Sequence, residues 1–218
     1  MDGAKEIMFG GQRLALLPDR AVWWATRQTL IVADVHLGKG TAFRRAGLPV
    51  PSGGSAKDLS RLSALLEYTG ARRLVVLGDL VHAKGSHQEE LAEEAIRWRE
   101  SRRTVEMLLV RGNHDRSAGR VPVAWGIEEV EEPFEEGGLV YAHEPRDEAG
   151  AAVLAGHVHP VLGVKDFARS VVRLACFVVD GDRCLTLPAF GSFTGGHAIQ
   201  RQEGRRVYVT SGIRVVSA

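Results

Sequence analysis

The sequence predicts an α/β fold built around a sheet with parallel strands. Three short apolar runs, at residues 30–33, 74–77 and 105–110, have the length and composition of buried strands. Between them lie two segments, 55–68 and 86–102, with apolar residues at helical spacing. Strands that alternate with helices in this way favour parallel neighbours, and polar residues that follow the strands then gather at one edge of the sheet.

The composition is typical of a soluble globular protein with no global charge bias. The chain has 218 residues, 44% hydrophobic and 25% charged, and a net charge of +1. Any anionic partner must therefore meet a local basic patch. No apolar stretch approaches the roughly 20 residues needed to cross a bilayer, and the N-terminal residues lack a signal-peptide hydrophobic region. We expect a cytoplasmic protein with no membrane association.

The segments around the alternating part read as short strands and turns. Before residue 30 we expect strands at 7–9, 14–17 and 21–24, joined by turns at Gly10-Gly11 and Pro18-Asp19. After Val121 the helical signal fades, and six further strands are expected. They cover 127–130, 139–142, 151–155, 171–179, 184–187 and 207–210. Cys176 and Cys184 flank a turn signal, and we expect two small buried side chains here in preference to a disulfide.

Capping patterns define the two expected helices. Ser55 and Asp58 resemble a capping pair at the start of the first, and Gly70 closes its end. Ser86 and Glu89 have the spacing of a capping box at the start of the second. The second helix should bury one face through Leu91, Ala95 and Trp98. The connection at 38–54 is rich in glycine and proline, and we expect it to be irregular.

Metal-type residues follow the apolar runs. Asp34 and His36 leave the strand at 30–33 and, two residues apart, point to the same side of an extended backbone. Further candidates in chain order are Asp79, Asn113, His114, Asp115, His143, His157 and His159. Carboxylate oxygens and imidazole nitrogens together suit first-row divalent metals. Two such cations about 3.5 to 4 Å apart are a device for phosphoryl chemistry, and Asp79 is the natural bridge because a carboxylate has two oxygens to share.

This order and spacing resembles the calcineurin-like metallophosphoesterase superfamily, from Asp34 to His159. The resemblance implies one domain over 1–218, with the metal motifs within 34–159 and the strands of 170–218 in the same domain. Its fold class is α/β (α+β), a four-layer αββα sandwich of two mixed sheets flanked by helices. It implies a first metal on Asp34, His36 and His159, a second on Asn113, His143 and His157, and Asp79 as the bridge.

The same resemblance gives His114 a catalytic role. The residue at this position faces the phosphate, and a histidine with a pKa near neutrality can protonate a departing alkoxide. Asp115 either orients His114 or is an exposed aspartate without a role. The chain departs from the superfamily pattern in one respect, because no second carboxylate follows Asp79 closely. His82 follows instead, and it either supports the site or is a partly exposed histidine. Gly78, Gly112 and Gly156, which precede Asp79, Asn113 and His157, fit turns that need positive φ or close backbone approach.

A narrower resemblance rests on residues 36–51, HLGKGTAFRRAGLPVP, and 187–196, LPAFGSFTGG. Both look like the bacterial ligase-associated DNA damage response endonucleases. That group is expected to act in DNA repair with an ATP-dependent DNA ligase, a helicase and an exonuclease-like protein. The likeness implies a manganese-dependent phosphodiesterase or nuclease acting on DNA, although the donor set also accepts iron, zinc or nickel.

Basic residues after the first metal motif agree with such a substrate. Lys39, Arg44 and Arg45 can reach phosphates flanking the scissile one, and Phe43 can stack on an unpaired base. The alternative is that Phe43 packs in the core and the charges are merely solvated. The chain shows no recognition helix, so we expect single-stranded or backbone-read DNA without sequence specificity.

Two other functions compete with the DNA endonuclease. One is a small-molecule or nucleotide phosphodiesterase or phosphatase, which would use the same metal residues. The other is a metal-free scaffold subunit, which normally shows missing ligands. Every expected position here retains a ligand-type residue, which argues against the scaffold.

Overall fold

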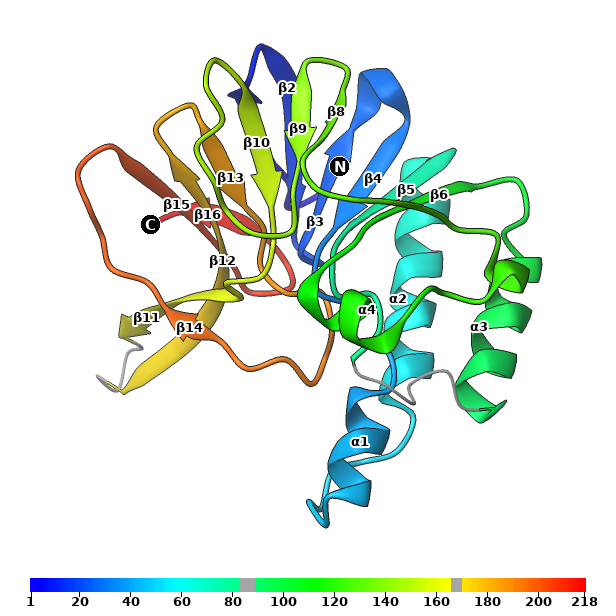
Figure 1. Ribbon diagram of the computed structural model, residues 1–218. Helices are drawn as coiled ribbons and strands as arrows, with labels where there is room; N and C mark the ends of the chain where they lie inside the picture. Colours follow the sequence, from blue (N-terminus) through cyan, green and yellow to red (C-terminus); the bar gives the residue numbers. More distant parts are fainter. Residues whose placement is uncertain (83–88, 166–169) are drawn as a thin grey trace.

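Two mixed β-sheets pack face to face in the computed structural model, which describes residues 1–82, 89–165 and 170–218 (Figure 1). The first sheet has the order β1-β2-β3-β4-β5-β6-β7. Its strands are β1 (Lys5–Phe9), β2 (Gln12–Leu17), β3 (Ala21–Trp24), β4 (Thr29–Val32), β5 (Arg73–Leu77), β6 (Glu106–Val110) and β7 (Glu128–Val130). Strands β1 to β4 are antiparallel, whereas β4 to β7 are parallel, as the alternation predicts.

The second sheet has the order β14-β11-β12-β13-β10-β9-β8, with β15 and β16 added beside β12. Its strands are β8 (Phe134–Glu136), β9 (Leu139–Tyr141), β10 (Ala152–Ala155), β11 (Pro160–Lys165), β12 (Val171–Asp180), β13 (Cys184–Thr186), β14 (His197–Ala198), β15 (Arg205–Thr210) and β16 (Val215–Ser217). The sequence did not indicate β8, β11, β14 or β16. Three of them have only two or three residues, too few for a periodic signal, so pairing with neighbours defines them.

The interior between the sheets comes from alternate residues of each strand. In β4, Leu30 and Val32 belong to the core under the helices, whereas Ile31 packs in the core between the sheets. Phe177 and Leu154 of the second sheet belong to the same core. Because both faces of β4 are covered, the strand is a continuous apolar run, the pattern that parallel buried strands share.

Helices cover the outer face of the first sheet (Figure 1). They are α2 (Gly54–Thr69) and α3 (Glu89–Glu100), while α1 (Lys39–Arg45), α4 (Asn113–Ala118) and two short 3-10 turns, Ala25–Arg27 and Val123–Trp125, lie in connections. The predicted sandwich of two mixed sheets is confirmed. Its layers differ in one respect: within the described residues, no helix lies on the outer face of the second sheet. Small apolar clusters lie there instead, with Val140 and Val153 in one and Cys176 and Val178 in another.

The expected irregular connection at 38–54 is wrong in its first half. Residues Lys39–Arg45 form the helix α1, which begins after Gly38 at φ 85° and precedes Pro49 and Pro51. The glycines and prolines that suggested a loop lie mostly at its ends, whereas Lys, Ala and Arg inside it are good helix formers.

The predicted caps of the two long helices have different outcomes. Ser55 and Asp58 do not cap α2, whose N-cap is Gly53 with no side-chain bond. Ser55 Oγ instead accepts the backbone N–H of Gly38 at 3.0 Å, so it ties α2 to the start of α1. Gly70 does end α2, in the left-handed conformation. The Ser86–Glu89 capping box involves side chains outside the described residues.

Other expectations about the interior are confirmed. Ala95, with Leu91 and Trp98, packs against the core under the helices. Cys176 and Cys184 are free and buried. Among the described helices, none is long and apolar enough to cross a membrane.

Candidate active site

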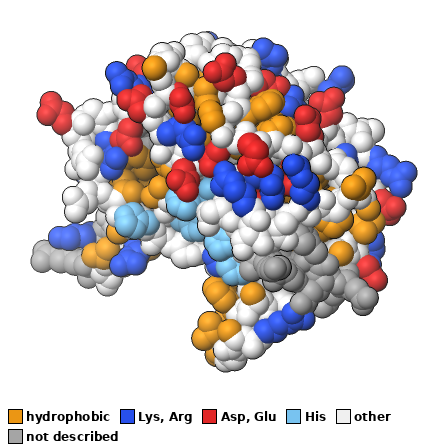
Figure 2. Space-filling model, in the orientation of Figure 1, with side chains coloured by type: hydrophobic (Ala, Val, Ile, Leu, Met, Phe, Trp, Pro, Cys, Tyr) orange, Lys and Arg blue, Asp and Glu red, His pale blue; other side chains and the backbone are white. Residues whose placement is uncertain are grey.

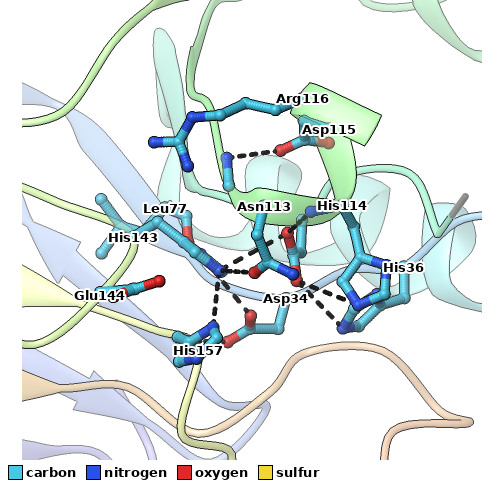
Figure 3. A network of polar contacts seen from close by, with 12 residues as sticks. Asp34, His36, Leu77, Asn113, His114, Asp115, Arg116, His143, Glu144 and His157 are labelled. Carbon is cyan, nitrogen blue, oxygen red and sulfur yellow. Dashed lines mark hydrogen bonds and ion pairs between the residues drawn. The ribbon is translucent and has the colours of Figure 1, made fainter. Parts of the chain in front are cut away.

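The predicted metal residues meet where strands of both sheets end (Figure 3). Asp34 follows β4, Asp79 follows β5 and Asn113 follows β6 in the first sheet, while His143 follows β9 and His157 follows β10 in the second. Parallel strands deliver their carboxyl ends to one edge, and the face-to-face packing of the sheets brings the two edges together. Figure 2 shows histidine side chains gathered in a hollow on this face, with Lys and Arg side chains beside them.

Unusual backbone geometry marks these turns. Of the seven non-glycine residues with positive φ in the described chain, five lie here: Asp34 (54°), His36 (52°), Asp79 (53°), His157 (67°) and His159 (50°). This left-handed region costs free energy for a residue with a Cβ, and it persists where the surrounding structure holds it for a purpose. Its concentration at five of the seven candidate ligands indicates a functional site.

One cluster of candidate ligands comprises Asp34, His36 and His159. Their ligand atoms lie within 4.8 Å of one another. Nε2 of His159 lies 3.3 Å from Asp34 Oδ1 and 3.4 Å from Nε2 of His36. The backbone N–H of His157 donates to the second oxygen of Asp34 at 2.9 Å, which fixes the carboxylate.

A second cluster comprises Asp79, His143 and His157, again within 4.8 Å, with Asn113 beside it. Nδ1 of His143 donates to the carbonyl oxygen of Leu77 at 3.2 Å. In the neutral ring, this bond places the lone pair on Nε2, which faces Asn113 Oδ1 at 3.0 Å and Asp79 Oδ1 at 3.5 Å. Lone pairs that converge in this way are the arrangement a cation stabilises.

Asp79 lies between the two clusters. Its Oδ2 is 3.7 Å from His36 Nε2, while its Oδ1 is 3.5 Å from His143 Nε2. One oxygen therefore faces each cluster, as the predicted bridge requires. Backbone N–H of His114, in the first turn of α4, donates to Oδ1 at 3.0 Å.

Three glycines allow the turns to approach this closely. A Cβ on Gly78 would lie 2.0 Å from His143 Nδ1, and Gly78 also has φ 75°. A Cβ on Gly112 would lie 2.3 Å from Asp79 Oδ1, and one on Gly156 would lie 2.7 Å from Asp34 Oδ2. The prediction of positive φ or close backbone approach therefore holds for all three.

The donor set fits divalent metal ions. Asp34 Oδ1, which faces His159 in the first cluster, is buried without a hydrogen-bond partner among the described residues, which is costly unless another ligand satisfies it. Burial lowers the pKa of His36 to about 2 and raises the pKa of Asp79. The imidazole is therefore neutral, as a metal ligand must be, and a cation would offset the cost of the buried carboxylate charge.

His114 and His82 lie beside the first cluster. The rings of His114 and His36 are 5.0 Å apart, and the His82 ring stacks on that of His114 at 5.1 Å. Nδ1 of His114 donates to the carbonyl oxygen of His82, so Nε2, 3.9 Å from Asp79 Oδ2, faces the site. His82 is half-buried, so it lies beside the site and is also partly exposed, and its supporting role stays a prediction.

Asp115 is neither exposed nor aimed at the ring of His114. It is 1% exposed and accepts the backbone N–H groups of Val81 at 3.1 Å and Gly112 at 2.9 Å. Its carboxylate therefore holds the turns after β5 and β6 together. The sequence expectation that it orients His114 is replaced by this role in the scaffold.

The predicted substrate contacts on α1 separate into two groups, one near the site and one away from it. Phe43 is half-buried, 6.1 Å from the His82 ring and 6.0 Å from Lys39 Nζ, so Phe43 and Lys39 lie near the site. Arg44 binds the carbonyl of Pro51 at 3.0 Å and Thr41 Oγ1 at 2.9 Å, which stabilises its own segment. Arg45 is exposed.

Comparisons with known proteins agree with this geometry. The model of the calcineurin-like phosphoesterase family matches residues 28–164. The chain belongs to the calcineurin-like phosphoesterase family. It is thus a metal-dependent phosphoesterase, and its fold class suggests divalent metal ions at the two clusters.

Two solved structures are similar to this phosphoesterase. The crystal structure of the nuclease MPE from Pseudomonas putida has a TM-score of 0.87 and 37% identity, covering 99% of this chain and all (100%) of that one. The phosphoesterase Yfce from E. coli has a TM-score of 0.41 and 16% identity, covering 83% of this chain and 86% of that one. No curated protein matches significantly.

The stretch 187–196 contacts both the stretch 36–51 and the turn before it in this phosphoesterase. A Cβ on Gly40 would lie 3.3 Å from the Phe193 ring. Backbone N–H groups of Phe190 and Gly191 donate to the carbonyls of Ala33 and Asp34 at 2.8 and 3.0 Å, and a Cβ on Gly191 would lie 2.3 Å from the carbonyl oxygen of Val35. The segment 187–196 therefore braces the turn that carries Asp34. This pairing has no signal in the sequence beyond the shared resemblance of the two stretches.

Asp58 connects the same segment to α2. It is 4% exposed and accepts the N–H and Oγ–H of Ser192 at 2.9 and 2.6 Å, and it pairs with Arg61 at 3.1 Å. Sequence reasoning took Asp58 for a cap because only its spacing from Ser55 was visible.

Glu132 is a positioning residue that the sequence did not reveal. Its Oε2 accepts the backbone N–H groups of His143 at 2.7 Å and Glu144 at 3.1 Å. Arg116 and Arg146 pair with the same carboxylate at 2.8 and 3.1 Å, which fixes it in place. No local pattern identifies such a residue, because its partners lie in other segments.

Replacing Glu132 with alanine is expected to lower kcat/KM on an aryl phosphodiester by roughly 10- to 100-fold, the range seen for residues that orient metal ligands. The turn at His143 loses two bonds, so the affinity for metal should fall as well. Glu132→Gln keeps an acceptor oxygen and should recover part of both losses. Glu131→Ala is the matched control, since Glu131 pairs with Arg111 and Arg116 on the exposed side. Equal effects of the Glu131 and Glu132 variants would contradict the positioning role.

Proposed function

We propose that this phosphoesterase is a binuclear metal-dependent phosphodiesterase that cuts DNA internally. The two ligand clusters that share Asp79 support phosphodiester hydrolysis. The likeness along the whole chain to the nuclease MPE, at 37% identity, is the observation that carries the choice of nucleic acid as substrate. The two stretches at 36–51 and 187–196 extend the proposal to DNA repair beside an ATP-dependent DNA ligase, a helicase and an exonuclease-like protein.

The proposed metal ligands follow the two clusters. Asp34, His36 and His159 would hold one ion, Asn113, His143 and His157 the other, and Asp79 both. The ions would stabilise negative charge on the phosphate and lower the pKa of a water molecule. We propose manganese, although the N/O donor set also accommodates iron, zinc or nickel.

Protein groups would complete the reaction. Nε2 of His114 faces the space beside Asp79, and Nδ1–H is held by the His82 carbonyl, so Nε2 would carry the transferable proton in the imidazolium form. In the proposed mechanism this atom protonates the departing alkoxide oxygen. Lys39 and Phe43, which lie beside His82, are the proposed contacts to a nearby phosphate and base.

Cleavage of circular single-stranded DNA, with metal analysis of the same preparation, tests the proposal. The expected result is manganese-dependent conversion of circles to linear strands by protein that binds two metal equivalents. Hydrolysis of an aryl phosphodiester with intact circles, and cleavage of linear DNA only, would instead indicate an exonuclease. Hydrolysis of the aryl ester or a nucleotide without any cleavage of DNA would indicate a small-molecule phosphodiesterase.

A further inference from the structure

A groove leads from the first ligand cluster along the second sheet. It consists of two adjoining hollows with volumes of about 250 and 440 Å³, which share Arg20, Arg173 and Ala175 in their walls. The first hollow begins at His159, and the second continues to Lys57 and Arg61. A polymer whose reacting phosphate lies at the clusters therefore has a path across the surface from His159.

Basic side chains outnumber acidic ones in this groove. Four basic residues line it, namely Arg20, Lys57, Arg61 and Arg173, and the adjacent acids are Asp19 and Asp58. Both acids pair with Arg61, at 3.8 and 3.1 Å. Two positive charges remain in excess, on a protein whose net charge is only +1.

Two of the basic residues that have no ion pair lie on different elements and project from the surface. Lys57 is on α2 and Arg173 on β12, and both are exposed. Within the part of the chain that the structure describes, neither has an ion-pair partner, whereas many surface arginines do. Two cations that project from separate elements into one groove are the arrangement that tracks successive phosphates.

Arg20 adds to the positive character of the floor. Its backbone is strained, with φ 66°, and its guanidinium donates to the carbonyl of Ala189 at 3.3 Å. Burial and the neighbouring Arg61 lower the pKa of Arg20, so positive charge is crowded here. An anion in the groove would relieve this repulsion.

The lining favours contacts to a sugar–phosphate backbone over contacts to bases. Apart from His159 at its mouth, no aromatic side chain is among the described residues that line the two hollows. Ser192, Thr194 and Ser211 supply hydroxyl groups instead. Phosphate and sugar contacts of this kind position a strand without reading its sequence.

We propose that this groove binds the backbone of a single nucleic-acid strand flanking the scissile phosphodiester, with its phosphates on Lys57 and Arg173. The proposal rests on the proposed function, because it presupposes a polynucleotide substrate. This groove is separate from the proposed contacts on α1, Lys39 and Phe43, which lie beside His82. The groove instead extends the substrate path from His159.

Substrate length provides the test. For the wild-type enzyme, KM should fall as the oligonucleotide grows from two to about eight nucleotides, within the site sizes of single-strand binders. In the double variant Lys57→Ala/Arg173→Ala this dependence should flatten, and KM for the longest substrate should rise on the order of tenfold. The slope of log KM against log salt should fall by about 1.4, or about 0.7 for each lost phosphate contact.

The matched control removes two arginines elsewhere. Arg13 and Arg206 are exposed and form surface ion pairs with Glu6 and Asp182, outside the residues that line the groove. Arg13→Ala/Arg206→Ala should keep the length and salt dependence of the wild type. Arg173→Lys keeps the positive charge, so it should retain most of the length and salt dependence of KM that Arg173→Ala loses. Thermal unfolding of each variant checks that it is folded.

Two results would overturn the proposal in different ways. If the wild type cuts oligonucleotides with the expected length dependence and the groove variants behave identically, the strand follows another path and the proposed function stands. If the wild type hydrolyses an aryl ester but no oligonucleotide of any length, the proposed function fails and the groove proposal fails with it.

Discussion

Asp79→Asn is expected to lower kcat on an aryl phosphodiester with manganese by about a thousandfold or more, equivalent to about 4 kcal/mol of transition-state stabilisation. The two oxygens of Asp79 face different clusters, at 3.7 Å from His36 and 3.5 Å from His143. Asparagine keeps the shape but has one oxygen and no charge. The variant should therefore also bind fewer than two metal equivalents.

The stability of the Asp79 variant should change in the opposite direction. Burial raises the pKa of this carboxyl, which means that its ionised form is unfavourable in the metal-free protein. Asp79→Asn without metal should thus unfold at the same temperature as the wild type or higher. Asp58→Asn is a suitable control, because Asp58 is another buried carboxylate but lies outside the clusters. An Asp79 variant that retains both metals and its rate would remove the shared carboxylate from the mechanism.

His114→Gln should show a loss that depends on the leaving group. A general acid contributes about 10²- to 10⁴-fold when the departing oxygen needs a proton. Cleavage of DNA, with its alkoxide leaving group, should fall by roughly a hundredfold or more, whereas hydrolysis of a nitrophenyl ester should fall less than about tenfold. The hydrogen bond that residue 114 donates to Asp79 comes from its backbone N–H, so it persists in the variant. The clusters should therefore remain intact.

His82→Gln is the matched control for this prediction. His82 stacks on the His114 ring, and its backbone carbonyl, which the substitution keeps, holds His114 Nδ1. Removing the His82 ring should lower DNA cleavage and nitrophenyl ester hydrolysis to a similar extent. A His114 variant that loses both activities equally would show that His114 supports the site without donating a proton to the leaving group.

The two stretches at 36–51 and 187–196 both support the first cluster. The first carries His36 and α1, and the second braces the turn at Asp34 through Phe190 and Gly191. A Cβ on Gly54 would lie 2.2 Å from the Phe193 ring, so this ring packs tightly where α2 begins. The first stretch therefore carries a residue of the first cluster, whereas the second braces that cluster and also borders the proposed groove.

Local properties explain which parts of the fold could be predicted. Strands β4, β5 and β6 are buried on both faces, so each is a continuous apolar run that ends visibly at a polar residue. The short helix α1 was missed because its flanking glycines and prolines outweighed seven residues of moderate propensity. Strands β8 and β14 could not be predicted, because segments of three and two residues are too short to show a periodic pattern.

The sequence by itself determined the identity and chain order of the candidate ligands. Side-chain chemistry and the period of a strand are local, so Asp34, Asp79 and His143 could be recognised at the ends of their apolar runs. The family resemblance already implied their division into two metal sets, and the tertiary structure places their ligand atoms in two clusters. Only the tertiary structure decided that Asp115 braces two turns and that Glu132 holds the backbone of His143. These relations depend on two sheets burying a common core, and that packing joins segments whose separation along the chain gives no sign that they meet.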